Sequence, residues 1–190
     1  ASFAGVDRYL DEALYPHAGV LLSNSAGAYG VTISEHIVMV TMMLLRRMLP
    51  IEEYVRRRDW APIMPMRSIF GSRITVLGTG DIGTTFARRA KGLGAKSVCG
   101  VRRSAKPADP AFDRVMTMEQ LNDVLPQTDI LVMAMPATAQ TVGTLNAERI
   151  ALLPPHAVEQ HLRPAQRASP QGGVMAVGDA DRHTGLHRQL

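Results

Sequence analysis

The fold is decided by residues 76–104, which read VLGTGDIGTTFARRAKGLGAKSVCGVRRS. An apolar run leads into a G-x-G-x-x-G stretch at residues 78–83, a helical pattern follows, and a second apolar run begins after Gly94. This spacing predicts a strand at Arg73–Leu77, a helix at Ile82–Leu93 and a strand at Ser97–Val101. Within such a strand–helix–strand unit, the glycine stretch is typical of a dinucleotide-binding turn.

Each glycine of this turn has a mechanical role. The first permits a tight turn out of the strand, the second lets the backbone approach a pyrophosphate, and the third lets the helix pack close to the sheet. The N-terminus of the helix then offers free N–H groups and a partial positive charge to phosphate. The predicted cofactor-binding residues of the turn are Gly78, Thr79, Gly80, Asp81, Ile82 and Gly83.

The end of the second strand carries Arg102, Arg103 and Ser104, where an acid often accepts hydrogen bonds from the adenosine ribose. A guanidinium pairs with a 2′-phosphate through two hydrogen bonds, whereas a carboxylate repels it. The sequence therefore favours NADP over NAD. Two alternatives remain: an arginine that stacks on adenine without selecting, and a solvated strand end.

The alternation of strands and helices continues after this unit. The pattern predicts a short strand near Val115, a helix at Met118–Leu125 begun by a Thr117/Gln120 capping box, and a strand at Ile130–Met135. Asn146 is expected to cap a last helical turn that reaches Leu153. Strands that alternate with helices in this way predict an α/β fold with a doubly wound parallel sheet.

The outer edge of this sheet is expected to be incomplete. In the usual strand order, Ile130–Met135 lies beside Arg73–Leu77 and needs a further strand on its other side. After Pro155 the pattern is lost, and only GGVMAVGD at residues 172–179 is able to form a strand. Unless Val174–Val177 supplies the missing strand, an exposed edge should cause aggregation or recruit a partner.

A helix is also predicted near the start of the chain. Thr32, with Glu35 three residues later, forms a capping box, and apolar residues at helical spacing continue to Leu49 before Pro50 stops the helix. Because nearly all of its faces are apolar, this helix should be buried, in part at a subunit interface.

Composition narrows the class of protein. The 190 residues are 46% apolar and 20% charged, with a formal net charge of +4 carried mostly in short basic clusters. Such clusters are typical of solvated helix faces, so we expect no nucleic-acid partner. The longest apolar stretch has 9 residues, fewer than the about 20 that cross a bilayer. We expect a cytoplasmic protein with no membrane partner, no metal site, and a buried Cys99 on a strand.

Four motifs in order resemble those of the D-isomer-specific 2-hydroxyacid dehydrogenases. They are AGVDRYL at 4–10, NSAGAYGVTISEHIVMVTMMLLRR at 24–47, VLGTGDIG at 76–83 and DILVMAMPATAQTVGTLN at 129–146. The resemblance implies that residues 1–24 are a remnant of a flavodoxin-like substrate domain and that residues 25–155 are a Rossmann-type dinucleotide-binding domain. Residues 156–190 would be an irregular tail.

The resemblance also implies roles for individual residues. The backbone amides of Ala4 and Gly5 would bind the substrate carboxylate, and Pro136, Ala137 and Thr141 would lie along the adenosine side of the cofactor. The helix at Thr32–Leu49 would form the interface of a homodimer.

The family transfers hydride between nicotinamide and a 2-keto or 2-hydroxy acid, with a histidine held by an acid and an arginine that orients the substrate. An Asn-x-x-Arg-Gly-like stretch is expected after ERIALLP, but the sequence reads PHAVEQHLRPAQRASPQGG. We therefore predict no catalytic residue in this chain and no activity from it alone. A non-catalytic nucleotide-sensing or partner-binding module is the alternative.

The tail contains His156, His161, His183 and His187, in a stretch rich in proline and glutamine without periodicity. We expect them to be exposed. The abrupt loss of pattern at Pro155 suggests a shifted reading frame of a GC-rich gene. Translation of the neighbouring frames of the genomic DNA tests this, and a continuation like VNxGRG is expected in one of them.

Overall fold

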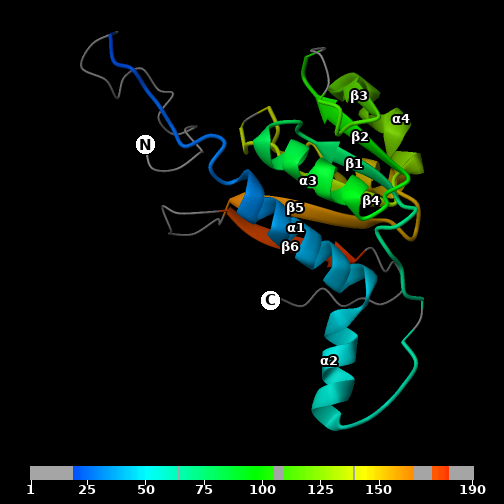
Figure 1. Ribbon diagram of the computed structural model, residues 1–190. Coiled ribbons are helices and arrows are strands. Elements are labelled where there is room, and N and C mark those ends of the chain that lie inside the picture. Colours follow the sequence, from blue (N-terminus) through cyan, green and yellow to red (C-terminus); the bar gives the residue numbers. More distant parts are fainter. Residues whose placement is uncertain (1–18, 64, 105–108, 139, 165–172, 180–190) are drawn as a thin grey trace.

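The computed structural model describes residues 19–63, 65–104, 109–138, 140–164 and 173–179, which build one mixed α/β sheet structure (Figure 1). The sheet has six strands in the order β3-β2-β1-β4-β5-β6. Every neighbouring pair is parallel except β5 and β6. The strands are β1 (Arg73–Leu77), β2 (Ser97–Arg102), β3 (Arg114–Thr117), β4 (Ile130–Met133), β5 (Val158–Pro164) and β6 (Gly173–Asp179). The predicted doubly wound parallel sheet is thus confirmed.

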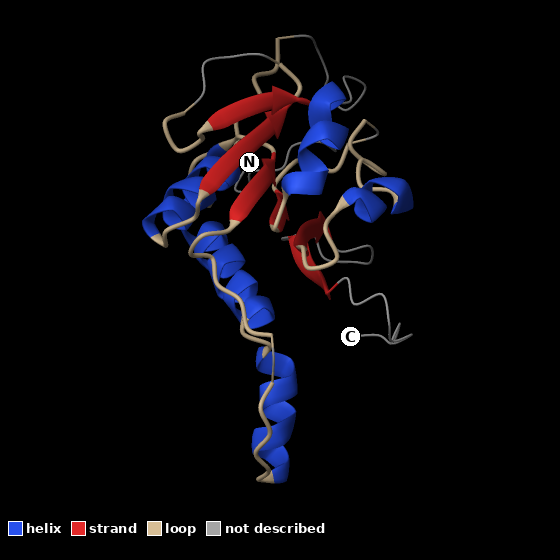
Figure 2. Cartoon of the chain, turned by 90° about the vertical axis from the view of Figure 1, so that its right-hand side faces the viewer, coloured by secondary structure: helices blue, strands red, loops and turns tan. Residues whose placement is uncertain are grey.

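Helices cover both faces of the sheet. The long helices α1 (Gly30–Leu45) and α3 (Asp81–Gly92) pack against each other on one face. The other face carries short elements: η3 (Met118–Gln120), α4 (Leu121–Val124), η4 (Leu125–Gln127) and α5 (Ala147–Leu152). Helix α2 (Met48–Arg57) has no buried residue and extends away from the sheet (Figure 2).

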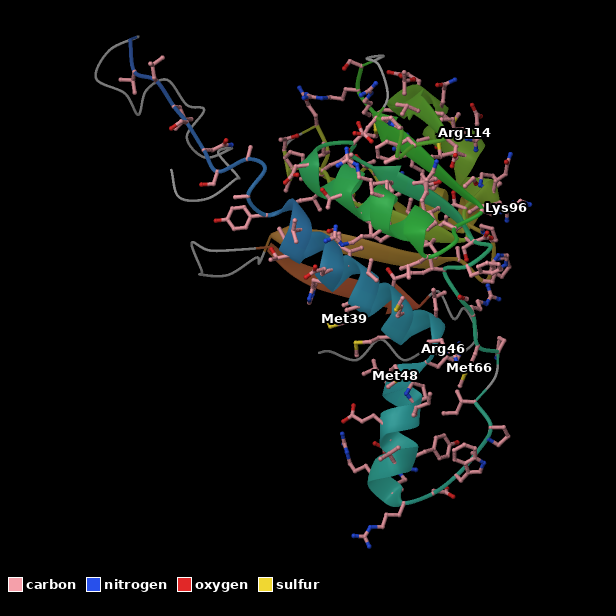
Figure 3. The ribbon with its side chains drawn as sticks, in the orientation of Figure 1. Met39, Arg46, Met48, Met66, Lys96 and Arg114 are labelled. Carbon is pink, nitrogen blue, oxygen red and sulfur yellow. The ribbon has the colours of Figure 1, made fainter. Side chains whose placement is uncertain are left out.

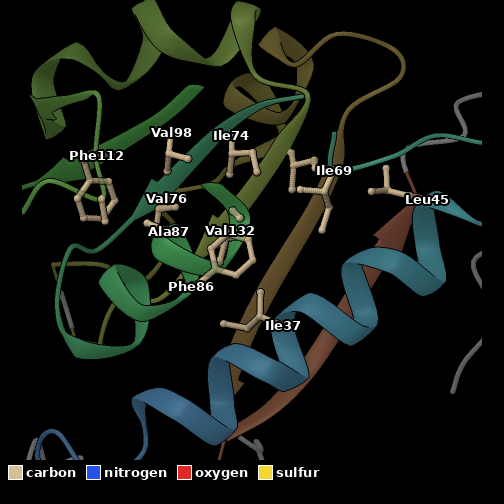
Figure 4. Close-up of a cluster of buried hydrophobic side chains, with 13 residues drawn as sticks. Ile37, Leu45, Ile69, Ile74, Val76, Phe86, Ala87, Val98, Phe112 and Val132 are labelled. Atoms are coloured by element: carbon tan, nitrogen blue, oxygen red, sulfur yellow. The ribbon is translucent and has the colours of Figure 1, made fainter. Parts of the chain in front are cut away.

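Strand alternation divides the buried side chains between two cores. Ile74 and Val76 of β1 face α1 and α3, where they meet Ile37 and Phe86 (Figure 4). Leu77, the next residue, joins the second core with Leu121 under the short helices. Full burial of a large apolar side chain contributes about 1.5–3 kcal/mol, so both faces of the sheet stabilise the domain. Cys99 is 4% exposed, as predicted.

The predicted capping box of α1 is wrong. The helix begins at Gly30, its N-cap is Tyr29, and no side chain caps it. Glu35 instead pairs with Arg89 of α3, with 3.3 Å between Oε1 and Nη2. A Cβ at Gly30 would lie 2.6 Å from the Oδ2 of Asp81, so a carboxylate from α3 sits at the start of α1. A negative charge there favours helix formation, and this tertiary contact accounts for the earlier start.

The predicted end of this helix is also wrong, because α1 stops at Leu45 rather than Leu49. Arg47 adopts a left-handed backbone with φ of 54°, which separates α1 from α2. Pro50 therefore falls in the first turn of α2, where a missing N–H breaks no helical bond.

Nor is α1 buried on all sides. Its buried residues follow a spacing of three and four: Gly30, Ser34, Ile37, Thr41 and Leu45. Several apolar side chains remain on the outer side, among them Val31, Met39, Met42 and Met43. The helix therefore has one face in the core and one apolar face toward solvent in the single chain.

Other predicted element ends are confirmed. Helix α3 is followed by Gly94 with φ of +81°, and the capping box between Thr117 and Gln120 is formed. Asn146 Oδ1 accepts a hydrogen bond of 2.9 Å from the Arg149 N–H. These signals are local, and the fold leaves them unchanged.

The strand beside β4 differs from the prediction. Val158–Pro164 fills this place as β5, with Ile130 opposite Val158 and Met133 opposite His161. Residues 174–177 belong to β6, which pairs antiparallel with the outer edge of β5. The edge of β4 is thus covered, and the region after Pro155 is not irregular throughout. The sequence VEQHLRP lacks the apolar run typical of an inner parallel strand, which is why the pattern did not predict β5.

Candidate nucleotide-binding site

A pocket of about 520 Å³ opens where β1, β2 and β4 reach their carboxyl ends. Gly78 follows β1, Arg102 ends β2 and Met135 follows β4. The chain builds β2 and β3 on one side of β1 and then crosses to β4 on the other side. Ligands of open α/β sheets bind outside such a switch point in strand order. The lining residues are Gly78, Arg102, Arg103, Met118, Met135, Pro136, Thr138, Gln140, Thr141, Val142, Gly143, Thr144 and Arg149.

The glycine turn at the floor of this pocket requires two of its glycines for steric reasons. Gly78 has φ of +98°, and a Cβ there would lie 2.5 Å from the carbonyl oxygen of Ala134. A Cβ at Gly83 would collide with the carbonyl oxygen of Gly78 and lie 3.1 Å from Val76 Cγ1. The turn therefore brings the start of α3 into direct backbone contact with the end of β1.

Gly80 differs from these two, because an added Cβ would meet nothing within 4 Å. It is the N-cap of α3, so open space lies directly before a helix N-terminus. The Thr84 N–H donates to the Gly80 carbonyl at 2.9 Å, and the Thr84 hydroxyl donates to the Thr79 carbonyl at 3.2 Å. An ordered turn with space beside its N–H groups fits a dinucleotide phosphate.

The side wall of the pocket is basic. Arg103 Nη1 donates a hydrogen bond of 3.2 Å to Gln140 Oε1. Arg149 is held by the Thr144 carbonyl at 2.8 Å and by Asn122 Oδ1 at 2.9 Å. Arg102 also lines the space, and among the described lining residues there is no acid. The charge of the wall therefore suits an anionic ligand.

The loop after β4 forms the opposite wall and is tied by one hydroxyl group. Thr141 Oγ1 donates to the carbonyl of Pro136 at 2.5 Å and accepts from the N–H of Thr138 at 2.8 Å. A hydroxyl has one proton to donate and two lone pairs, so Thr141 serves both contacts at once. This pair of bonds orders the segment that carries Gln140.

The structure brings some of the predicted residues together and leaves others apart. Gly78, Arg102, Arg103, Pro136 and Thr141 line the pocket. Residues 79–83 form the turn and the start of α3 beside it. Ser104 and Ala137 are exposed and lie outside the lining, and Ala4 and Gly5 lie outside the described residues.

Sequence reasoning missed the remaining lining residues: Met118, Met135, Thr138, Gln140, Val142, Gly143, Thr144 and Arg149. Most belong to the 129–146 motif, so treating its whole loop as part of the site would have found them. Met118 and Arg149 come from separate helices on the second face. No local signal marks those two.

A second ionic cluster lies at the other end of β4, around Asp129. Asp129 accepts hydrogen bonds from the Arg73 N–H at 2.8 Å, from Arg73 Nε at 3.0 Å and from Arg73 Nη2 at 2.8 Å. His156 Nε2 lies 2.8 Å from Asp129 Oδ1. Burial acts to raise the pKa of this carboxyl, but the bonds from Arg73 and His156 outweigh it and hold the pKa well below its ordinary value.

His156 is exposed, as predicted, but it is not a loose tail histidine, because its ring contacts Asp129. It joins the start of β5 to β4 at the edge of the sheet away from the pocket. His161 lies within β5, and His183 and His187 fall outside the described residues. Across the part of the chain that the structure describes, no cluster of three His, Cys, Asp or Glu could hold a metal ion.

Comparison with known proteins assigns a family to this arrangement. The sequence profile described as "D-isomer specific 2-hydroxyacid dehydrogenase, NAD binding domain" matches residues 38–158. A D-lactate dehydrogenase of Treponema pallidum (strain Nichols) is 33% identical over 150 residues, which cover 78% of this chain and 44% of the relative. The chain thus spans less than half the length of that curated relative.

Two solved structures share the fold. A D-isomer specific 2-hydroxyacid dehydrogenase family protein from Aeromonas salmonicida subsp. salmonicida A449 superposes with a TM-score of 0.70 at 33% identity, covering 83% of this chain and 49% of that one. A D-isomer specific 2-hydroxyacid dehydrogenase from Xanthobacter autotrophicus Py2, solved with NADPH and MES, gives a TM-score of 0.65 at 28% identity, covering 81% and 62%. None of the helices among the described residues has the length and apolar character needed to span a bilayer.

Proposed function

Because the chain belongs to the D-isomer specific 2-hydroxyacid dehydrogenase family and carries its NAD-binding domain, we propose that the pocket beside β1 holds a nicotinamide dinucleotide, NADPH in preference to NADH. The observation that carries this proposal is an open, N–H-lined turn at Gly80 next to a pocket wall with arginines and no acid among its described residues. When bound, the cofactor supplies or accepts a hydride.

Different residues of the chain would bind different parts of the cofactor. Residues 78–83 would hold the pyrophosphate through backbone N–H groups at the start of α3. Pro136, Ala137 and Thr141 would lie along the adenosine. Arg102, Arg103 and Ser104 would meet the 2′-phosphate, and hydrogen bonds to a charged group are worth about 1.5–3 kcal/mol. That corresponds to a preference for NADPH of roughly tenfold to a hundredfold.

We further propose that the whole protein acts on 2-hydroxy or 2-keto acids and that this chain alone does not turn them over. A substrate-orienting Arg-Gly pair is expected after the strand that follows α5, but β5 ends with Arg163 and Pro164. In this proposal Ala4 and Gly5 would contribute only backbone amides to the substrate carboxylate. Consumption of NADPH with glyoxylate, pyruvate and larger keto acids measures this, and robust turnover would contradict it.

The outer face of α1 favours a homodimer. Met39 lies on the side of α1 away from α3 (Figure 3) and is 48% exposed, and Val31 is 55% exposed. Large apolar patches on a helix with its other face in the core mark association surfaces. We propose that two copies pair through this face in the cytoplasm.

A matched pair of substitutions tests cofactor binding. Gly80→Arg places a side chain before α3, where an added Cβ would meet nothing within 4 Å, and should abolish NADPH binding measured by calorimetry. Gly92→Arg, at the far end of the same helix and equally free of neighbours, should leave binding unchanged. Equal affinities in both variants and the wild type would refute the site.

A further inference from the structure

We propose that Gln140 is a positioning residue for NADPH selection: it holds Arg103 in place to receive the 2′-phosphate. This inference rests on the proposed function and adds to it a residue on the opposite wall of the pocket. Selection would then depend on two segments of the chain, the end of β2 and the loop after β4, rather than on the arginines alone.

The geometry of the pair supports this role. Arg103 follows β2, Gln140 lies in the loop after β4, and both line the pocket. The bond of 3.2 Å between Arg103 Nη1 and Gln140 Oε1 joins positions 37 residues apart in the chain. The two bonds of Thr141, the next residue, order the loop on which Gln140 sits. Gln140 is therefore an anchored acceptor on a wall that faces Arg103.

The chemistry of the amide suits this role. A guanidinium has five N–H groups, and the bond to Gln140 uses Nη1, so Nε and Nη2 form a separate edge of the kind that pairs with phosphate through two bonds. An arginine that is already oriented loses less conformational freedom when the phosphate arrives. The amide is also neutral and does not repel the anion.

A carboxylate at the same position would have the opposite effect. Glu at 140 would pair with Arg103, neutralise part of its charge and repel a 2′-phosphate. It would leave a ligand with a free 2′-hydroxyl much less affected, because carboxylates accept hydrogen bonds from hydroxyls. The substitution Gln140→Glu replaces only the amide nitrogen of an exposed side chain with an oxygen. It should therefore weaken the binding of NADPH much more than the binding of NADH.

The test measures the affinities of NADPH, NADH and 2′,5′-ADP for the full chain by calorimetry at one salt concentration. Gln140→Glu should weaken NADPH and 2′,5′-ADP by about tenfold or more and change NADH by less than about twofold. Gln140→Ala should weaken the two phosphate ligands by roughly twofold to fivefold through loss of preorganisation. Gln127→Glu, an exposed glutamine of η4 outside the pocket lining, is the matched control and should change nothing.

Each contrary result has a distinct meaning. If the wild type binds no nucleotide, the proposed function itself is overturned. If the wild type prefers NADPH and Gln140→Glu keeps that preference, only the role of Gln140 is overturned. Tighter NADPH binding by Gln140→Ala would also overturn it, because Gln140 would then compete with the phosphate for Arg103. Unchanged thermal unfolding of the variants checks that they are folded.

Discussion

At the scale of single residues, Asp129 stands out among the described residues outside the pocket for its polar contacts. It accepts three hydrogen bonds from Arg73 and contacts His156, and its side chain is 19% exposed. Asp129→Asn removes the charge and part of the acceptor capacity, and should lower the free energy of unfolding by about 1–3 kcal/mol at neutral pH. Urea denaturation measures this, with Asp123→Asn, an exposed carboxylate of α4, as a control that should change little.

The same carboxyl predicts a pH dependence. Its pKa is depressed in the folded chain, so the unfolded chain takes up the proton first when the pH falls below the ordinary value of about 3.9. The stabilisation by Asp129 is therefore complete well above this value and decreases as the pH falls through it toward the folded-state pKa. The difference in stability between wild type and Asp129→Asn should shrink over this acidic range. A constant difference would contradict the assigned cause.

At the scale of elements, the end of α3 should depend on Gly94 and not on Gly92. Gly94 has φ of +81°, and a Cβ there would lie 2.5 Å from Phe70 Cδ2. Gly94→Ala should cost about 1–2 kcal/mol or more. Gly92 is the last residue of α3, and an added Cβ there would meet nothing within 4 Å, so Gly92→Ala should be neutral or stabilise by up to about 1 kcal/mol. Thermal unfolding measures both, and equal effects would refute this account.

At the scale of the whole molecule, the proposed dimer should depend on the outer face of α1. Met39→Glu introduces a charge on this face and should shift the chain from dimer to monomer in light scattering coupled to gel filtration. Leu152→Glu on α5, where the side chain is 39% exposed compared with 48% for Met39, should leave the dimer intact. A wild type that stays monomeric at high concentration, or dimers in both variants, would rule out this interface.

The central strand–helix–strand unit, the glycine turn and the order of the elements from β1 to α5 follow from the sequence alone. These features depend on local chemistry. Gly78 and Gly94 adopt a positive φ, and the Thr117/Gln120 box and Asn146 cap their helices. Along each strand, successive side chains point to opposite faces of the sheet. Backbone conformation and capping depend on a few neighbouring residues. For this reason they could be predicted from the sequence.

Contacts between distant parts of the chain set where α1 begins, which strand lies beside β4 and which residues close the pocket. The first depends on Asp81 meeting Gly30, the second on backbone pairing of a polar segment with β4, and the third on Arg103 meeting Gln140. Each is a contact between residues far apart in the chain. Backbone hydrogen bonds between strands and contacts between polar groups form wherever the fold brings the two partners close together. No local pattern in the sequence therefore records them.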